Sequence, residues 1–181
     1  MRSAPRLPVS LRAALAAALC AVLVSHAQAP VSPGPEHEAL KKLAGEWTAT
    51  VKSPEGEVPG TMTARMEMGG LWLSSEFRST FMGQPFVGRG LDTYDPATRK
   101  HVSVWVDSMI TRPLVFEGTM DPTRKTLTMT AEGTGMDGKP ARFKSVSHYP
   151  DADHQHFTLY QVGADGSEQK MISIEYVRKK S

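Results

Sequence analysis

Residues 71–109 read LWLSSEFRSTFMGQPFVGRGLDTYDPATRKHVSVWVDSM, and this stretch decides the expected fold. It contains three segments rich in Val, Phe, Trp and Thr, each with a period of two: Leu71–Met82, Phe86–Tyr94 and His101–Met109. Short links of Gly, Asp and Pro separate them. Links of this length join antiparallel neighbours, because parallel strands need long crossover connections. The stretch therefore predicts three consecutive strands of an antiparallel sheet.

The same pattern continues on both sides of this stretch. The further strand candidates are Glu46–Lys52, Thr61–Met68, Leu114–Met120, Thr126–Glu132, Ala141–Tyr149, His156–Val162 and Lys170–Arg178. Before them, Leu40, Leu43 and Ala44 share one face at helical spacing, after a proline suited to a helix start. The sequence therefore predicts one short helix, Pro35–Ala44, followed by about ten strands.

A sheet of about ten up-and-down strands has two exposed edges unless it closes on itself. Closure gives an all-β, antiparallel up-and-down barrel, wide enough to hold a small ligand beside its own side chains. A β-sandwich is the competing architecture, but it is usually connected by longer Greek-key links, which this sequence does not show.

Length and composition limit the function further. A chain of 181 residues suits one domain, and 40% apolar with 22% charged residues is typical of a globular protein rather than a disordered one. The formal net charge of +2 offers no electrostatic basis for nucleic-acid binding. The single cysteine, Cys20, excludes an internal disulfide and a cysteine-based zinc site.

The N-terminus has the pattern of a signal peptide. Three arginines precede the apolar run Ala13–Val24, and Ser25-His26-Ala27 offers a small-x-small cleavage site. The apolar run is shorter than the roughly twenty residues that span a bilayer, so the mature chain is expected to have no transmembrane span. We therefore expect a signal peptide over residues 1–27, cleavage after Ala27, and a secreted or periplasmic protein.

Cleavage would change the net charge and the cysteine content of the mature chain. It removes three arginines and Cys20, which leaves 18 basic and 19 acidic residues and a formal charge of −1. Residues 28–34 (QAPVSPG) are Pro-rich and predict a disordered lead. Residues 35–180 then form the predicted barrel domain.

Several segments resemble a bacterial family known as domain of unknown function 1579. They are Glu36-His37-Glu38-Ala39-Leu40, Gly45-Glu46-Trp47, Met82-Gly83-Gln84-Pro85-Phe86, Trp105-Val106-Asp107-Ser108-Met109 and Glu175-Tyr176-Val177-Arg178-Lys179. The resemblance covers residues 35–180 and implies a lipocalin-like (calycin) barrel. It carries over no catalytic residue and no cofactor.

Gly45-Glu46-Trp47 also resembles the Gly-x-Trp motif at the start of the first lipocalin strand. In those barrels an arginine near the chain end packs over the tryptophan and closes the base. The resemblance implies this role for Trp47 and Arg178, through a cation on an aromatic face.

Candidate ligand-binding residues come from two of the central strands. In His101–Met109, Val102, Val104 and Val106 share one face, and Ser103, Trp105 and Asp107 share the other. The second face is either the barrel interior or a solvent face with an exposed tryptophan. Trp72, Glu76 and Arg89 are further candidates: Glu76 and Arg89 either join Asp107 in a polar cavity or form charge pairs on the outside.

His148, His154 and His156 form the sole group with metal-like spacing. Three imidazoles could hold zinc or copper, but a solvated hairpin turn explains the same residues, so no metal is assigned. Some calycin barrels bind haem through one histidine, for which His148 or His156 are the candidates.

These observations favour a secreted or periplasmic barrel that binds a small, mostly apolar ligand in its interior, with no cofactor identified. One alternative is an enzyme, an isomerase or hydrolase, with Asp107 or Glu76 as general base. The others are a haem-binding barrel and a barrel whose outer face binds another protein.

Overall fold

The computed structural model describes residues 31–135 and 137–180. The predicted signal peptide, residues 1–27, and the start of the predicted lead lie outside the described residues. Residues 31–34 carry no helix or strand. In the described ranges, no helix is long and apolar enough to cross a membrane.

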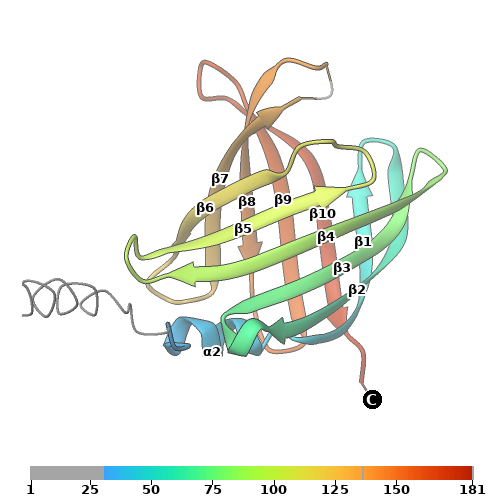
Figure 1. Cartoon of the computed structure of the whole chain (residues 1–181). Helices are drawn as coiled ribbons and strands as arrows, with labels where there is room; N and C mark the ends of the chain where they lie inside the picture. Colours follow the sequence, from blue (N-terminus) through green and yellow to red (C-terminus); the bar gives the residue numbers. More distant parts are fainter. Residues whose placement is uncertain (1–30, 136, 181) are drawn as a thin grey trace, which may run out of the picture. The chain divides into compact units, whose positions relative to one another are not determined.

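Over the described residues, one short helix and ten strands make up the fold. Figure 1 shows how they are arranged. The elements are α2 (Pro35–Lys41), β1 (Gly45–Ser53), β2 (Gly56–Glu67), the 3₁₀ turn η1 (Met68–Gly70), β3 (Trp72–Phe81), β4 (Gln84–Asp95), β5 (Lys100–Asp107), β6 (Leu114–Met120), β7 (Thr126–Thr134), β8 (Pro140–His148), β9 (His154–Val162) and β10 (Glu168–Arg178). Every predicted strand is present. The helix ends earlier than predicted, because Leu43 and Ala44 donate to carbonyls three residues back and tighten the chain into turns.

The sheet closes into a barrel. Each strand pairs antiparallel with its neighbours in the chain, and β1 pairs with β10 to complete the ring. In that closing pair, Trp47 lies opposite Arg178 and Ala49 lies opposite Tyr176. The predicted antiparallel up-and-down barrel is therefore confirmed, and the sandwich is excluded.

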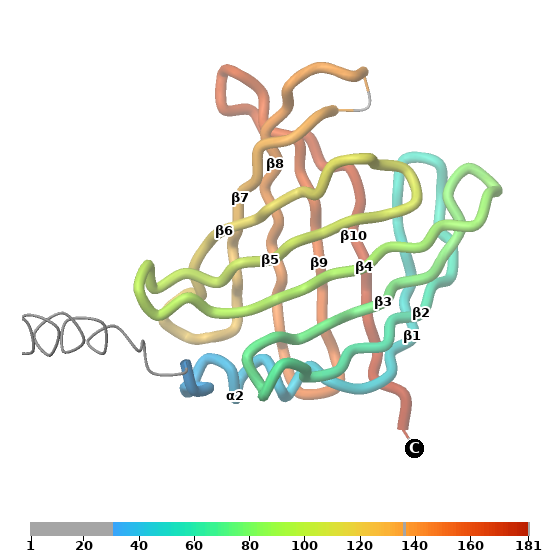
Figure 2. The backbone as a smooth tube through the Cα atoms, viewed as in Figure 1, coloured from blue at the N-terminus to red at the C-terminus, as the bar shows by residue number. Residues whose placement is uncertain are grey.

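Helix α2 lies across one end of the barrel (Figure 2). Its Leu40 is buried against Ala64 of β2 and Leu73 of β3. Its His37 is also buried, and the ring lies edge-on to Tyr94 of β4, with 6.3 Å between the ring centroids. The apolar face predicted from the helical spacing thus covers this end, which we call the base.

Two apolar clusters line the interior. The first contains Trp47, Ala49, Phe77, Ile174 and Tyr176, and the second contains Phe116, Leu127, Met129, Ala131 and Phe143. They come from opposite parts of the strand order, β1–β3 with β10 and β6–β8. The strands β4, β5 and β9 lie between these two clusters in the strand order.

Candidate functional site

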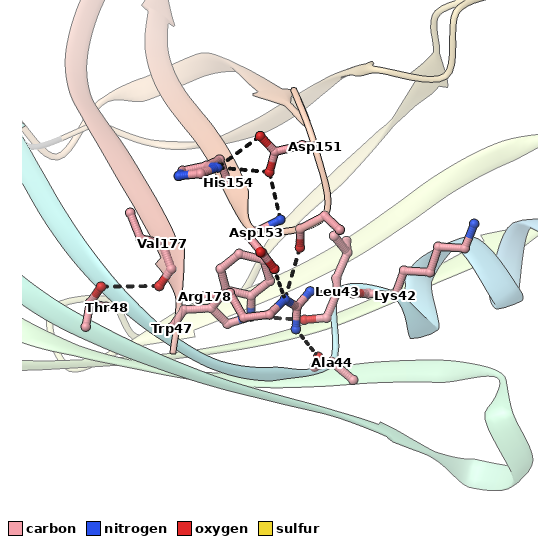
Figure 3. A network of polar contacts seen from close by, with 11 residues as sticks. Lys42, Leu43, Ala44, Trp47, Thr48, Asp151, Asp153, His154, Val177 and Arg178 are labelled. Carbon is pink, nitrogen blue, oxygen red and sulfur yellow. Dashed lines mark hydrogen bonds and ion pairs between the residues drawn. The ribbon is translucent and has the colours of Figure 1, made fainter. Parts of the chain in front are cut away.

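The base is closed by the Trp47–Arg178 contact. Trp47 is 1% exposed, and the guanidinium carbon of Arg178 lies 4.1 Å from the centroid of its ring (Figure 3). The Trp47 indole N–H donates to the carbonyl of Leu43 at 3.1 Å. Gly45 has a φ of +136°, and a Cβ at this position would lie 2.6 Å from Arg178 Nη1. The glycine of the Gly-x-Trp motif is therefore required by both its backbone and the guanidinium.

Arg178 also donates hydrogen bonds to backbone carbonyls that follow α2 and to one in the β8–β9 turn. It donates to Ala44 at 2.7 Å, to Lys42 at 2.6 Å and to Ala152 at 3.0 Å. Asp153 lies 3.4 Å from its Nε atom. One side chain thereby ties the end of α2 and the β8–β9 turn to the last strand.

We predict that Arg178→Met lowers the free energy of unfolding by about 2–3 kcal/mol, because these carbonyls lose a charged donor. Urea denaturation measured by circular dichroism checks this value. Arg78→Met is the control, since Arg78 pairs with Glu76 at an exposed position and is expected to cost under about 1 kcal/mol. Equal losses in the two variants would contradict the assigned role of Arg178.

Trp105 and Asp107 lie on the interior face of β5. Trp105 pairs with Gly90 of β4 and Leu114 of β6, and its ring packs against the first apolar cluster. It covers Gly88 so closely that a Cβ there would overlap the indole. The indole N–H donates to Asp107 at 2.8 Å, and the backbone N–H of Met109 donates to the other carboxylate oxygen at 2.8 Å.

The valine face of β5 points outward instead. Val106 is 44% exposed, and Val104 and Val106 line a groove of about 640 Å³ on the outer surface of β2–β5. Of the two interpretations of β5, the structure selects the interior one for Ser103, Trp105 and Asp107.

Trp72, Glu76 and Arg89 lie on the outer face, away from Trp105 and Asp107. Glu76 pairs with Arg78 and Arg89, each at 2.7 Å. The hydrogen bond from Arg78, and then the contacts with Arg89, hold the pKa of Glu76 below its usual range. The prediction that Glu76, Arg89 and Asp107 share a polar cavity is therefore wrong. Glu76 and Arg89 form an ion pair on the outer face, because Glu76 is next to the inward, buried Phe77 and successive side chains of a strand point to opposite faces.

The interior also contains Asp92, an acidic residue that the sequence analysis does not predict as part of the site. Asp92 of β4 pairs with Ser103 of β5, whose hydroxyl is hydrogen-bonded to the carboxyl group. The Asp92 residue is partly accessible, and its carboxyl group is partly withdrawn from solvent on the interior face. This burial raises the pKa of Asp92 to about 6, with the Ser103 hydrogen bond acting in the opposite direction.

Two tyrosines from the other side of the strand order also contribute hydroxyl groups to the interior. Burial raises the pKa of Tyr149, which follows β8, and of Tyr176 in β10, and the charge of Asp92 adds to both shifts. Tyr149 also forms a side-chain hydrogen bond with Ser147. We call Asp92, Ser103, Ser147, Tyr149 and Tyr176 the interior polar group.

Two buried polar atoms nearby have no hydrogen-bond partner among the described residues. They are Nδ1 of His101, which is 5% exposed, and Oγ of Ser145, which is 2% exposed. Burial is the main cause that lowers the pKa of His101 and keeps the imidazole neutral. Its ring lies edge-on to Tyr94, with 5.2 Å between centroids. Native interiors pair nearly all such atoms, so each of these calls for a partner.

Much of the interior face is only partly buried. Gln155, Phe157, Leu159 and Gln161 of β9 face inward opposite β8 and β10, and all four retain intermediate exposure. Ser103 and Trp105 on β5 do as well. A close-packed core would bury such side chains more completely, so these inward positions are less tightly packed than the two apolar clusters.

His148, His154 and His156, the three candidates for metal or haem binding, lie outside this interior. His148 and His156 lie opposite each other on the outer face of β8 and β9, with 6.3 Å between ring centroids, and both are exposed. His154 instead contacts Asp151 at 2.9 Å. Over the described ranges, no three His, Cys, Asp or Glu side chains gather closely enough to hold a metal ion. The positions of His148 and His156 do not fit an interior haem.

Comparison with solved structures finds a similar fold. Rv2717c from M. tuberculosis is similar with a TM-score of 0.60 and 16% identity, over 81% of this chain and 99% of that one. A de novo designed fluorescence-activating β-barrel is similar with a TM-score of 0.44 and 18% identity, over 78% of this chain and 97% of that one. The likeness to Rv2717c concerns the fold alone. No curated protein matches the sequence.

The family resemblance rests on the whole barrel domain rather than on isolated motifs. A family model described as "Protein of unknown function (DUF1579)" matches residues 32–178, a range that includes α2 and all ten strands. The chain therefore belongs to the DUF1579 family.

Proposed function

We propose that this protein binds a small, mostly apolar molecule inside the barrel. The observation that carries the proposal is the pair of buried atoms without a partner among the described residues, His101 Nδ1 and Ser145 Oγ, in an interior whose walls are otherwise largely apolar. Small-molecule sites typically combine such walls with a few convergent polar groups. A ligand with one polar group satisfies both features.

The size of the barrel supports the same proposal. Eight strands already give an interior that can hold one small ligand, and this barrel has ten. The partial exposure of Phe157, Leu159 and Trp105 adds accessible apolar surface within it. Covering that surface with a ligand gains roughly 25 cal/mol for each Å² removed from water.

Tryptophan fluorescence tests the proposal, because the tryptophans occupy different environments. Titration with the apolar probe N-phenyl-1-naphthylamine is expected to quench Trp105 at micromolar concentration by energy transfer and contact. Trp72→Phe removes the outer-face tryptophan and should preserve the response, whereas Trp105→Phe should lose most of it. No response to the probe, or a response that disappears with Trp72, would contradict interior binding.

A separate titration with haem tests the alternative that the protein is a haem-binding barrel. Because His148 and His156 are exposed outside the barrel, we expect that His148→Ala and His156→Ala leave the Soret spectrum unchanged after haem addition. A sharp, stoichiometric Soret band that either substitution abolishes would favour the haem-binding alternative instead.

We also propose that the protein is exported and acts as residues 28–181. The support is the sequence pattern of basic residues, apolar run and Ser25-His26-Ala27. Intact-mass measurement of the protein expressed with its own N-terminus in a Gram-negative host should find a chain that begins at Gln28. Ala27→Leu is expected to block this cleavage, because the site requires a small residue. Full-length protein in the cytoplasm would contradict the proposal.

A further inference from the structure

The interior carries acidic charge that the described residues do not neutralise. The strand register turns Asp92 and Asp107 inward. Among the described residues of the ten strands it turns no lysine inward, and Arg178 at the base is the only inward arginine. That guanidinium is engaged by Trp47 and by three backbone carbonyls.

The two interior aspartates differ in how they are satisfied. Asp107 accepts the indole N–H of Trp105 and the backbone N–H of Met109, so each of its oxygens has a donor. Asp92 lies opposite Ser103 on the interior face, and it forms no ion pair with any described residue. A carboxylate that is partly withdrawn from solvent and has no cation beside it is incompletely compensated, which favours a proton or a cation from elsewhere on Asp92.

The surroundings of Asp92 suit a cation. The hydroxyl oxygens of Tyr149, Tyr176 and Ser147 can accept hydrogen bonds, and the oxygen of Ser145 has no partner among the described residues. Trp105 and Tyr176 provide aromatic faces, which attract an ammonium group. A carboxylate ligand would instead meet like charge from both aspartates.

We propose that the ligand is an apolar amine whose protonated nitrogen pairs with the carboxylate of Asp92, while its apolar body lies along the interior walls. This inference rests on the proposed function and specifies the ligand's class. The amine supplies the cation that Asp92 lacks, and its remaining N–H groups reach the oxygens of the interior polar group. The charge-assisted hydrogen bonds so formed are the strong ones in a low-dielectric interior.

The experiment compares three ligands that share one apolar chain: decylamine, decanol and decanoate. Each competes with N-phenyl-1-naphthylamine for the wild-type protein at pH 8, where Asp92 is ionised. We expect decylamine to bind at least tenfold more tightly than decanol, and decanoate to bind more weakly than either. In Asp92→Asn the advantage of decylamine over decanol should fall below threefold, with decanol binding retained.

Glu76→Gln is the matched control, because it removes an acid from the outer face and should keep the full amine preference. The outcomes separate two failures. If neither the probe nor any of the three ligands binds, interior binding itself is overturned. If decanol or decanoate binds the wild type as tightly as decylamine, or Asp92→Asn keeps the amine preference, interior binding stands and the amine inference is overturned.

Discussion

Trp47→Ala is expected to lower the free energy of unfolding by about 3–5 kcal/mol, the largest loss we predict for a single substitution in this protein. Trp47 is 1% exposed, lies in the first apolar cluster, and supports the Arg178 guanidinium at 4.1 Å. Its removal leaves a cavity beneath a cation and deprives the Leu43 carbonyl of its donor. For a domain of this size the melting temperature should fall by roughly 6–20 °C.

Thermal and urea denaturation measured by circular dichroism check this result, since the signal does not depend on the lost tryptophan. Trp72→Ala is the control, because it makes the same change on the outer face. We expect it to cost about 1 kcal/mol or less. If the two variants lose similar stability, Trp47 does not anchor the base in the way that the geometry indicates.

Asp92→Asn is expected to stabilise the protein at pH 8 by up to about 3 kcal/mol. The pKa of Asp92 is raised from its ordinary value of 3.8 to about 6 by burial, and this difference corresponds to about 3 kcal/mol. Between these two pH values the folded protein binds a proton that the unfolded chain has released. The contribution of protonated Asp92 to stability is therefore complete below pH 3.8 and is lost as the pH rises through about 6.

The variant carries a neutral side chain at every pH, so its advantage over the wild type should appear only as the pH rises. Urea denaturation of both proteins at pH 4 and pH 8 measures the difference. The comparison at each pH is necessary because carboxylates such as Glu76 and Glu175, whose pKa values are lowered by ion pairs, act in the opposite direction. A constant difference between the two pH values would contradict the buried, unpaired state of Asp92. The expected stability of the variant also means that its loss of amine preference cannot be attributed to unfolding.

Part of the candidate site could be predicted from the sequence. Trp105 and Asp107 were identified because a large aromatic residue beside an acid is unusual on a strand, and both face the interior. Asp92 was not identified, although it follows Gly88 and Gly90 at intervals of two on a face that Tyr94 continues. Those glycines were a usable signal, since small residues on one face accommodate a large neighbour such as Trp105. Tyr149 and Tyr176 could not be linked to Asp92, because they are distant from it in the chain and come to influence its electrostatics only once the barrel closes.

The amino-acid sequence by itself determined the ten strands, their antiparallel order, the short helix and the family. These features depend on local alternation, on turn residues and on short links, all of which are visible in neighbouring residues. Only the tertiary structure decided which face of each strand points inward. On β5 a row of valines faces outward and a row with Ser103, Trp105 and Asp107 faces inward, against the usual expectation for aliphatic residues. The physical reason is that the alternation of side chains along a strand defines two faces but does not say which one is inside the barrel. The pairing of β1 with β10 closes the sheet and thereby fixes the inner face of every strand.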